Sequence, residues 1–391
     1  MAIPHIKMGC CMSCFSSSSC LNMRFIRLIY IIFLLIAFIC SVAVQNRPAL
    51  FNNVFWNFFP AYKQIGAFDR VWAFVIRFSF TFFVFHFSLF AFSLFQLSTK
   101  TVQVAKFFHR GLIYVKFIIL LILFFSFFAV SNQDMQNFAY LSAAFAGFFQ
   151  FFQLFIYAEL FYLLYDYMLN GSTFTRICGI LWIVVHFAVC AFCIIFVIVR
   201  TQHLVYIITT SIFCAILLIA YVLSSIPKSH GTAFVVSGLS SIAGIHYLRI
   251  CAGNQPGLDP TGQTILNQAG IDTCNSFLLI FTIAALFIMN MVQITPRTLF
   301  IGSASPPDVA DFASTLEDED TRSGEASYYY WAFHLLMMQA ACYMSQVYSF
   351  SGPRVLYGVN FGFGVAGSFV FLLYLAWTAF LPVVLKNRIF E

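Results

Sequence analysis

The residues from 136 to 168, QNFAYLSAAFAGFFQFFQLFIYAELFYLLYDYM, decide the fold. The stretch carries no charge before Glu159, so it is apolar enough to lie in lipid. Backbone polar groups in lipid must bond within their own segment, which favours a helix. At a rise of about 1.5 Å per residue, this helix is roughly 50 Å long, against a hydrocarbon core of about 30 Å. We therefore predict a transmembrane helix that crosses the bilayer diagonally, because it must tilt steeply or protrude.

Apolar runs of spanning length recur along the whole chain. Of 391 residues, 61% are hydrophobic and 9% are charged, whereas soluble domains carry about 25% charged residues. The runs predict spans near 25–45, 70–95, 111–131, 136–168, 176–199, 203–224, 232–251, 275–293, 328–348 and 361–384. The sequence thus indicates an all-α polytopic membrane protein with about ten transmembrane helices. The net charge of +6 forms no basic stripe, so we exclude nucleic acid as a partner.

Polar segments divide the chain. Residues 1–24 form a Cys/Ser-rich N-terminus, 25–293 hold the first eight predicted spans, and 328–391 hold the last two with a short tail. Residues 294–327 contain half of the acidic residues and are expected to be a flexible loop, either a docking segment or a plain tether. Lys and Arg outside the spans are about twice as frequent on the side of the N-terminus, which predicts that both termini are cytosolic.

Two groups of cysteines suggest covalent modification. Four lie beside the first span in a Ser-rich context that is typical of palmitoylation: Cys10, Cys11, Cys14 and Cys20. No histidine or second CxxC completes a zinc site with them. Cys251 and Cys274 bracket a Gly/Asn/Pro-rich loop on the opposite side, where an oxidising compartment would favour a disulfide between them.

Ionisable and amide side chains inside the predicted spans are the candidate functional residues, because each ionisable group costs about 2.5–3.5 kcal/mol in hydrocarbon on insertion scales. Counted along the helices, Lys116, Glu159 and His334 fall in the leaflet nearer the N-terminus. Gln150 and Gln153 lie one or two turns from Glu159. Two interpretations remain open. Lys116 and Glu159 form an ion pair that locks two helices, or the five residues line a polar track for lipid headgroups or ions.

Arg77 falls about 10 Å below the opposite surface, where we expect its side chain to snorkel to lipid headgroups. The sequence contains no HExxH, Gly-x-Ser-x-Gly, P-loop or paired intramembrane aspartates. We therefore predict a non-enzymatic protein with no catalytic residue, no metal site and no cofactor.

Several segments, taken in order, resemble the serine incorporator family. The cysteine cluster followed by Arg27 and Tyr30, FVIRFSF at 75–81 with Arg77, and FFQLFIYAEL at 151–160 are similar to family elements. So are FFHRGLIYVKFIILLILFFSFFAVSN at 107–132, YYYWAFHLLMMQAACYMSQVYSF at 328–350 and LYLAWTAFLP at 373–382. The chain departs from the family where Ala129 and Val130 replace Ile-Pro and where Glu159 replaces Asp. It therefore resembles a distant member.

The resemblance implies ten helices in two subdomains separated by the long diagonal helix. It also implies a lipid-binding groove and energy-independent phospholipid scrambling, or support of phosphatidylserine and sphingolipid synthesis, at the plasma membrane or an endomembrane. We hold two alternatives beside it: a proton-coupled transporter of a serine-like solute, and a scaffold for lipid-synthesis enzymes. The partners to consider are membrane phospholipids, a second copy of the chain and those enzymes.

Overall fold

Ten α-helices make up nearly all of the described chain. The computed structural model describes residues 23–46, 67–97, 108–109, 111–169, 172–201, 203–226, 231–258, 265–292, 330–347 and 355–384. Within these ranges the elements are α2 (Met23–Asn46), α5 (Ala67–Ser93), the short 3-10 helix η1 (Leu94–Leu97), α7 (Ile113–Phe127), α8 (Asn132–Leu169), α9 (Thr173–Arg200), α10 (Leu204–Ser224), α11 (Thr232–Leu258), α12 (Gln268–Val292), α15 (Tyr330–Val347) and α16 (Val355–Val384). No strand occurs in them. Each predicted span coincides with one α-helix, so the all-α prediction is confirmed.

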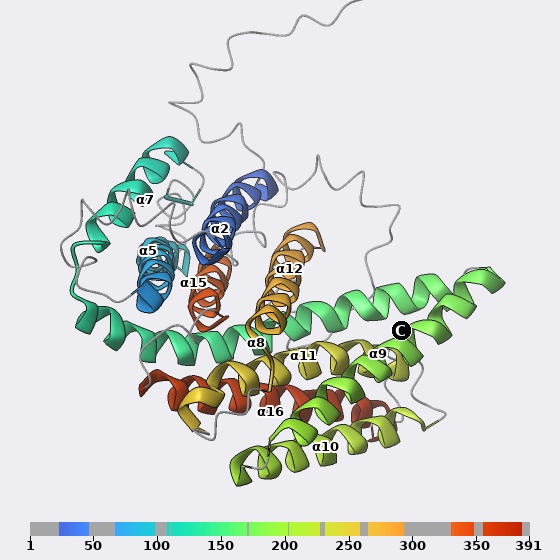
Figure 1. The fold of residues 1–391 in the computed structure, drawn as a ribbon. Coiled ribbons are helices and arrows are strands. Elements are labelled where there is room, and N and C mark those ends of the chain that lie inside the picture. Colours follow the sequence, from blue (N-terminus) through green and yellow to red (C-terminus); the bar gives the residue numbers. More distant parts are fainter. Residues whose placement is uncertain are drawn as a thin grey trace, which may run out of the picture.

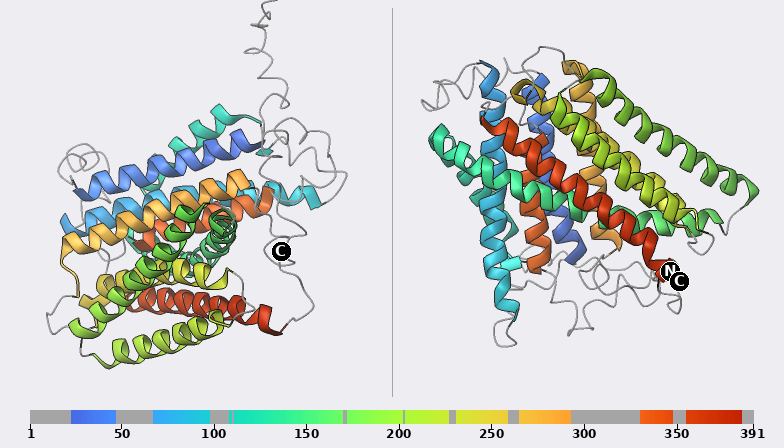
Figure 2. Two further views of the ribbon diagram at one scale, coloured as in Figure 1. Left: turned by 90° about the vertical axis from the view of Figure 1, so that its right-hand side faces the viewer. Right: turned by 90° about the horizontal axis from the view of Figure 1, so that it is seen from below.

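The long helix predicted at 136–168 is α8, with 38 residues. It passes between two sets of helices (Figures 1 and 2). The first helix group contains α2, α5, α7, α12 and α15, and the second contains α9, α10, α11 and α16. Within the first group α15 packs on α5 and α2 packs on α12, and within the second α11 packs on α9 and α16. Because α8 contacts both groups, the predicted division into two subdomains crossed by one helix is confirmed.

The outer surfaces of the helices are apolar. Eight of the helices in the described ranges are long and apolar enough to cross a membrane. On α9 and α10, large side chains such as Val199, Leu204 and Leu218 are exposed. An exposed apolar surface of this extent is stable only where lipid covers it. The chain is therefore an integral membrane protein.

Two helices fall outside that set of eight. α7 is apolar but has only 15 residues. α15 is less hydropathic, since His334, Gln339, Ser345 and Gln346 lie along it, and yet its residues 336–347 are all buried. Its neighbours are α5, α8, α12 and α2. α15 is thus a polar helix that the other helices shield from lipid.

α8 and α16 cross closely through glycines. A Cβ atom added to Gly367 would lie 3.4 Å from the backbone of Gly147 and 2.6 Å from Oε1 of Gln150. Small residues at such a crossing allow two membrane helices to approach closely. Glycine at 367 therefore fixes how near the second helix group lies to α8.

Candidate functional site

Three histidines from separate elements form a hydrogen-bonded chain inside the first helix group. Nδ1 of His86, on α5, lies 3.0 Å from Nδ1 of His334, on α15. Nε2 of His334 lies 2.9 Å from Nδ1 of His109, which precedes α7. All three side chains are at most 1% exposed. His334 therefore connects the other two rings, using a different nitrogen for each.

Tyr30 and Lys116 close one side of this histidine cluster. The Lys116 ammonium donates to the Tyr30 hydroxyl and to the backbone carbonyl of His109, both at 2.8 Å. The Tyr30 hydroxyl donates to the same carbonyl at 3.1 Å, and its ring packs edge-on against His86 and His334. Arg27 lies over the ring of Phe333. We define the histidine cluster as His86, His109, His334, Tyr30 and Lys116.

A second polar cluster lies where the two helix groups meet across α8. On α11, the 2% exposed Arg249 donates to the carbonyls of Gln346 and Val347 at the end of α15 and to Oδ1 of Asn275 on α12. The last carbonyls of a helix lack intrahelical donors and carry partial negative charge. Arg249 therefore ties the second helix group to the C-terminal end of α15.

α8 continues this polar surface along its own length. Gln150 donates to Gln346 at 3.2 Å, and Gln153 donates to Thr282 of α12 at 3.4 Å. Ser142 contacts Ser345 of α15, and the Tyr157 hydroxyl donates to the Phe281 carbonyl at 2.5 Å. The Tyr343 hydroxyl of α15 and Nδ1 of His246 on α11 lie 3.1 Å apart. We call the whole set the polar seam: Ser142, Gln150, Gln153, Tyr157, His246, Arg249, Asn275, Thr282, Tyr343, Ser345 and Gln346.

Several polar atoms of the seam are buried without a hydrogen-bond partner among the described residues: Oε1 of Gln150, Oε1 of Gln153, Nε2 of His246 and Nδ2 of Asn275. A buried polar group without a partner costs about 1–3 kcal/mol. Several together in one place indicate a site that water or a ligand occupies. The seam is therefore suited to contact a hydrated or polar molecule.

The family comparison agrees with this architecture. The family model described as serine incorporator matches residues 4–242. The chain belongs to the serine incorporator family. This match extends from the N-terminus into α11, so it includes α8, and the similar segments at 328–350 and 373–382 lie beyond it. Comparison with curated proteins gives no match.

This serine incorporator divides four of the five predicted track residues between the two clusters. Lys116 and His334 lie in the histidine cluster, whereas Gln150 and Gln153 lie in the seam. The side chain of Glu159 is outside the described residues. A single track lined by all five residues stays a prediction, and the four residues whose side chains are described lie in two clusters.

The prediction that the Arg77 side chain snorkels to lipid headgroups is wrong for this serine incorporator. That side chain is 0% exposed and does not snorkel. Its guanidinium donates to the carbonyls of Phe127 and Val130 and to Oδ1 of Asn132, at 2.8 to 3.1 Å. These acceptors belong to the turn between α7 and α8. The C-terminal end of α7 and the turn after it supply hydrogen-bond acceptors inside the protein, so the Arg77 guanidinium bonds to them and not to lipid headgroups.

The cysteine predictions differ in outcome. Cys251 and Cys274 are both free thiols, so the disulfide predicted between them is absent and that prediction is wrong. Cys251 is 0% exposed on α11, with its carbonyl accepting from Tyr206, and a buried position inside a span gives it no contact with the oxidising side. Cys10, Cys11, Cys14 and Cys20 lie outside the described residues.

Sequence reasoning missed the main members of both clusters in this serine incorporator. His86 lies inside the predicted span 70–95 but is not among the candidate residues, and His109 falls just before the predicted span 111–131. Arg249 falls two residues before the end of the predicted span 232–251, whereas α11 continues to Leu258 and places it in the interior. The sequence did contain a signal that Arg249 is an interior residue, because it lies within an uninterrupted helical stretch that ends near the Gly/Asn/Pro-rich loop.

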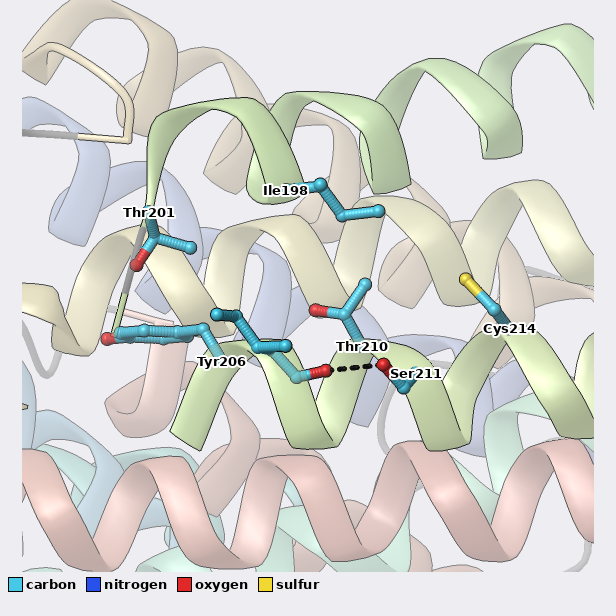
Figure 3. A pocket seen from close by; sticks show the side chains of 7 residues that line it. Ile198, Thr201, Tyr206, Thr210, Ser211 and Cys214 are labelled. Atoms are coloured by element: carbon cyan, nitrogen blue, oxygen red, sulfur yellow. Dashed lines mark hydrogen bonds between the residues drawn. The ribbon is translucent and has the colours of Figure 1, made fainter. Parts of the chain in front are cut away.

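A separate cavity of about 190 Å³ lies between α9 and α10 (Figure 3). Hydroxyl and apolar side chains line it: Ile198, Thr201, Tyr206, Ile207, Thr210, Ser211 and Cys214. The only hydrogen bond drawn among them joins the Ser211 hydroxyl to the Ile207 carbonyl of the same helix, at 2.8 Å. Because no charged group lines the cavity, it does not extend the polar seam.

Proposed function

We propose that this serine incorporator is a non-enzymatic lipid-handling protein that lets phospholipid headgroups exchange between leaflets along the polar seam, without an energy source. The headgroup passes between α8 and α15, where Gln150 and Ser142 face Gln346 and Ser345. The acyl chains remain in the surrounding lipid. Exchange down a concentration gradient needs no nucleotide site, which agrees with the absence of a P-loop from the sequence.

The observation that carries this proposal is the position of the partnerless polar atoms of the seam. In membrane proteins, polar side chains between helices commonly act as glue, contributing about 0.6 kcal/mol per bond. Polar side chains that hold helices together in this way have their hydrogen bonds satisfied, whereas Gln150, Gln153 and Asn275 each keep a buried atom unpaired among the described residues. Those atoms offer donors and acceptors to a headgroup that would otherwise lose its hydration in hydrocarbon.

The division into two helix groups supports a way for the seam to open. α8 contacts both groups, and Arg249 joins α11 to the end of α15. A small rotation of one group against the other exposes the amides of α8 and α15 to lipid without unfolding a helix. Such movements between packed helices occur in microseconds to milliseconds. The closed arrangement described above is then the resting state.

Locking α8 to α15 tests the proposal. Ser142 and Ser345 touch through their hydroxyl oxygens, so Ser142→Cys with Ser345→Cys, in a Cys342→Ala background, is expected to form a disulfide. The purified protein is reconstituted with a fluorescent phospholipid, and an external quencher measures how much label reaches the outer leaflet. Exchange should stop after oxidation and return after reduction. The single variant Ser142→Cys in the same background is the control, and its rate of lipid exchange should not change on oxidation or reduction.

Two results would reject the proposal. One is lipid exchange by the reduced or unmodified protein no faster than in protein-free liposomes. The other is exchange that persists when the crosslink is complete by mass spectrometry. Uptake of serine driven by a pH gradient, with no lipid exchange, would instead favour a solute carrier.

A further inference from the structure

We propose that the cavity between α9 and α10 binds an uncharged lipid whose head is a hydroxyl group. The hydroxyl groups of Thr201 and Tyr206 are directed to one end of this cavity, and Cys214 lies at the other end (Figure 3). A ligand with a small polar head and an apolar body matches this division. The cavity is separate from the polar seam, so the proposal does not depend on lipid exchange.

The cavity extends along one leaflet of the membrane. α10 has 21 residues, which makes it roughly 30 Å long, the thickness of the hydrocarbon core. Counted from its first residue, Leu204, Tyr206 lies about 3 Å and Cys214 about 15 Å along the helix. The hydroxyl end of the cavity is therefore at the level of lipid heads, and the other end is near the middle of the bilayer.

The cavity is open to the surrounding lipid. Ile198 and Ile207 are 54% and 48% exposed, whereas Thr201 and Thr210 on the inner wall are buried. A lipid can therefore enter sideways from the bilayer. The volume of about 190 Å³ is several times the roughly 30 Å³ that a water molecule occupies in the liquid. This space suits the head and the adjoining part of a lipid, and the rest of the molecule would lie on the apolar outer surface of α9 and α10.

The side chains at the hydroxyl end offer both donors and acceptors. Oγ1 of Thr201 accepts from the His203 backbone N–H at 3.4 Å, so the Thr201 O–H proton is available to a ligand. The Tyr206 hydroxyl donates to the Cys251 carbonyl at 3.4 Å, and its oxygen serves as an acceptor. The His203 ring packs edge-on against Tyr206, and its buried Nδ1 has no partner among the described residues. A lipid hydroxyl has one donor and two acceptor positions, so it matches this set.

The inner wall of the cavity is held in place by α11. The Thr210 hydroxyl is hydrogen-bonded to the Tyr247 hydroxyl at 2.8 Å, and Tyr206 bonds to the backbone of Cys251. Both partners belong to α11, which packs on α10. The hydroxyl groups are thus positioned before a ligand arrives, which lowers the entropic cost of binding.

The lining discriminates against charged lipids. No Lys, Arg, Asp or Glu is among the residues that line the cavity. Arg200 directly precedes Thr201, but its guanidinium lies over the Phe196 ring, at 5.4 Å and one turn earlier on α9. A phosphate in the cavity would lose its hydration without gaining an opposite charge. Phospholipids are therefore excluded, and two common lipids share the required chemistry: sterols and diacylglycerols.

Photolabelling tests the site. The full chain is reconstituted in phosphatidylcholine liposomes with a diazirine-bearing sterol, diacylglycerol or phosphatidylcholine, and labelled residues are identified by mass spectrometry. The sterol or the diacylglycerol should label the residues of the cavity, and an excess of the same unlabelled lipid should remove that label. The phosphatidylcholine probe should label the outer surfaces of the helices without saturation. A competitor with its hydroxyl methylated should compete about fivefold less well, because it has lost the donor.

A double variant separates hydroxyl recognition from shape. Thr201→Val with Tyr206→Phe keeps the volume of the lining and removes two hydroxyl groups, so saturable labelling should fall about fivefold or more. Tyr221→Phe is the matched control, because Tyr221 lies on the same helix, bonds to Ser240 and does not line the cavity. This control should label as wild type does.

Three results would overturn the proposal. They are the absence of saturable labelling at the cavity by both uncharged probes, equal competition by phosphatidylcholine, and equal competition by the methylated lipid. The last two are measured on the wild-type protein, so they hold even if the double variant does not fold. Lipid exchange is followed in parallel samples and should be unchanged in the double variant, which distinguishes failure of this site from failure of the proposed lipid exchange.

Discussion

Replacing Arg77 by methionine should destabilise the protein by about 1–3 kcal/mol. Methionine approximates the apolar length of the side chain and removes every donor. Val130 and Asn132 would each lose the donor that Arg77 supplies at 2.8 Å. An acceptor left unsatisfied costs about 1–3 kcal/mol when it is buried, and Val130 and Asn132 are both half-buried. The loss of the Arg77 contact with the Phe128 ring adds to the same effect.

Lysine at this position separates charge from shape. Arg77→Lys keeps a positive charge, but its single ammonium cannot reproduce the planar fork that reaches Phe127, Val130 and Asn132 together. We expect it to recover about half of the lost stability. Arg200→Met is the matched control, because Arg200 is an exposed arginine at the end of α9. It should change the free energy of unfolding by less than about 0.5 kcal/mol.

The free energy of unfolding is measured in mixed micelles by titration with sodium dodecyl sulfate, with helix content and tryptophan fluorescence as two probes. Coincident transitions justify a two-state treatment. If Arg77→Met unfolds at the wild-type midpoint, the bonds to the α7–α8 turn do not stabilise the protein. If Arg77→Lys equals wild type, the charge alone is sufficient and the argument from the fork geometry is wrong.

Three further outcomes are expected. Gly367→Ala should destabilise the protein by about 1–3 kcal/mol in the same titration, because its Cβ would lie 2.6 Å from Oε1 of Gln150. Gly358→Ala is the control: its Cβ would meet nothing within 4 Å, so the substitution should leave the free energy of unfolding unchanged or raise it. Tyr30→Phe should lower the free energy of unfolding by about 1–3 kcal/mol, since it removes the hydroxyl that bonds to Lys116 and to the His109 carbonyl. Tyr114→Phe, at an exposed tyrosine of α7, should leave the free energy of unfolding unchanged. Alkylation of denatured, unreduced protein should label both Cys251 and Cys274 by mass spectrometry, and an unlabelled pair linked as one disulfide peptide would contradict the free thiols.

The fold could be predicted because each helix is specified locally. A run of about 20 apolar residues has few stable forms in lipid other than a helix, and the length of α8 follows from its uninterrupted sequence. Charged residues and helix-breaking residues between the apolar runs then marked where each of the ten helices begins and ends. None of these signals depends on which helix lies next to which.

The site depends on those neighbours, and so it was predicted only in part. Lys116 and His334 belong to one cluster, as their similar depth suggested, but depth along a helix does not fix its rotation. Rotation directs Lys116 to Tyr30 and the His109 carbonyl. Arg77 was placed at the right depth, yet the turn of residues 127–132 that binds it is remote in the sequence. Arg249 lies only two residues before the end of the predicted span 232–251, and α11 in fact continues to Leu258, which places this charge in the interior.

The polar character of α15 has a consequence for how the protein is made. With His334, Gln339 and Gln346 on it, this helix would enter bare lipid at a considerable cost, since polar residues near the centre of a segment oppose release from the translocon. Its packing partners α2, α5, α8 and α12 all precede it in the chain. They are synthesised first, and they form a lined site that receives α15 as it emerges. Membrane insertion of this segment is therefore coupled to assembly of the earlier helices, and a defect in any of those helices would leave α15 without a place to insert.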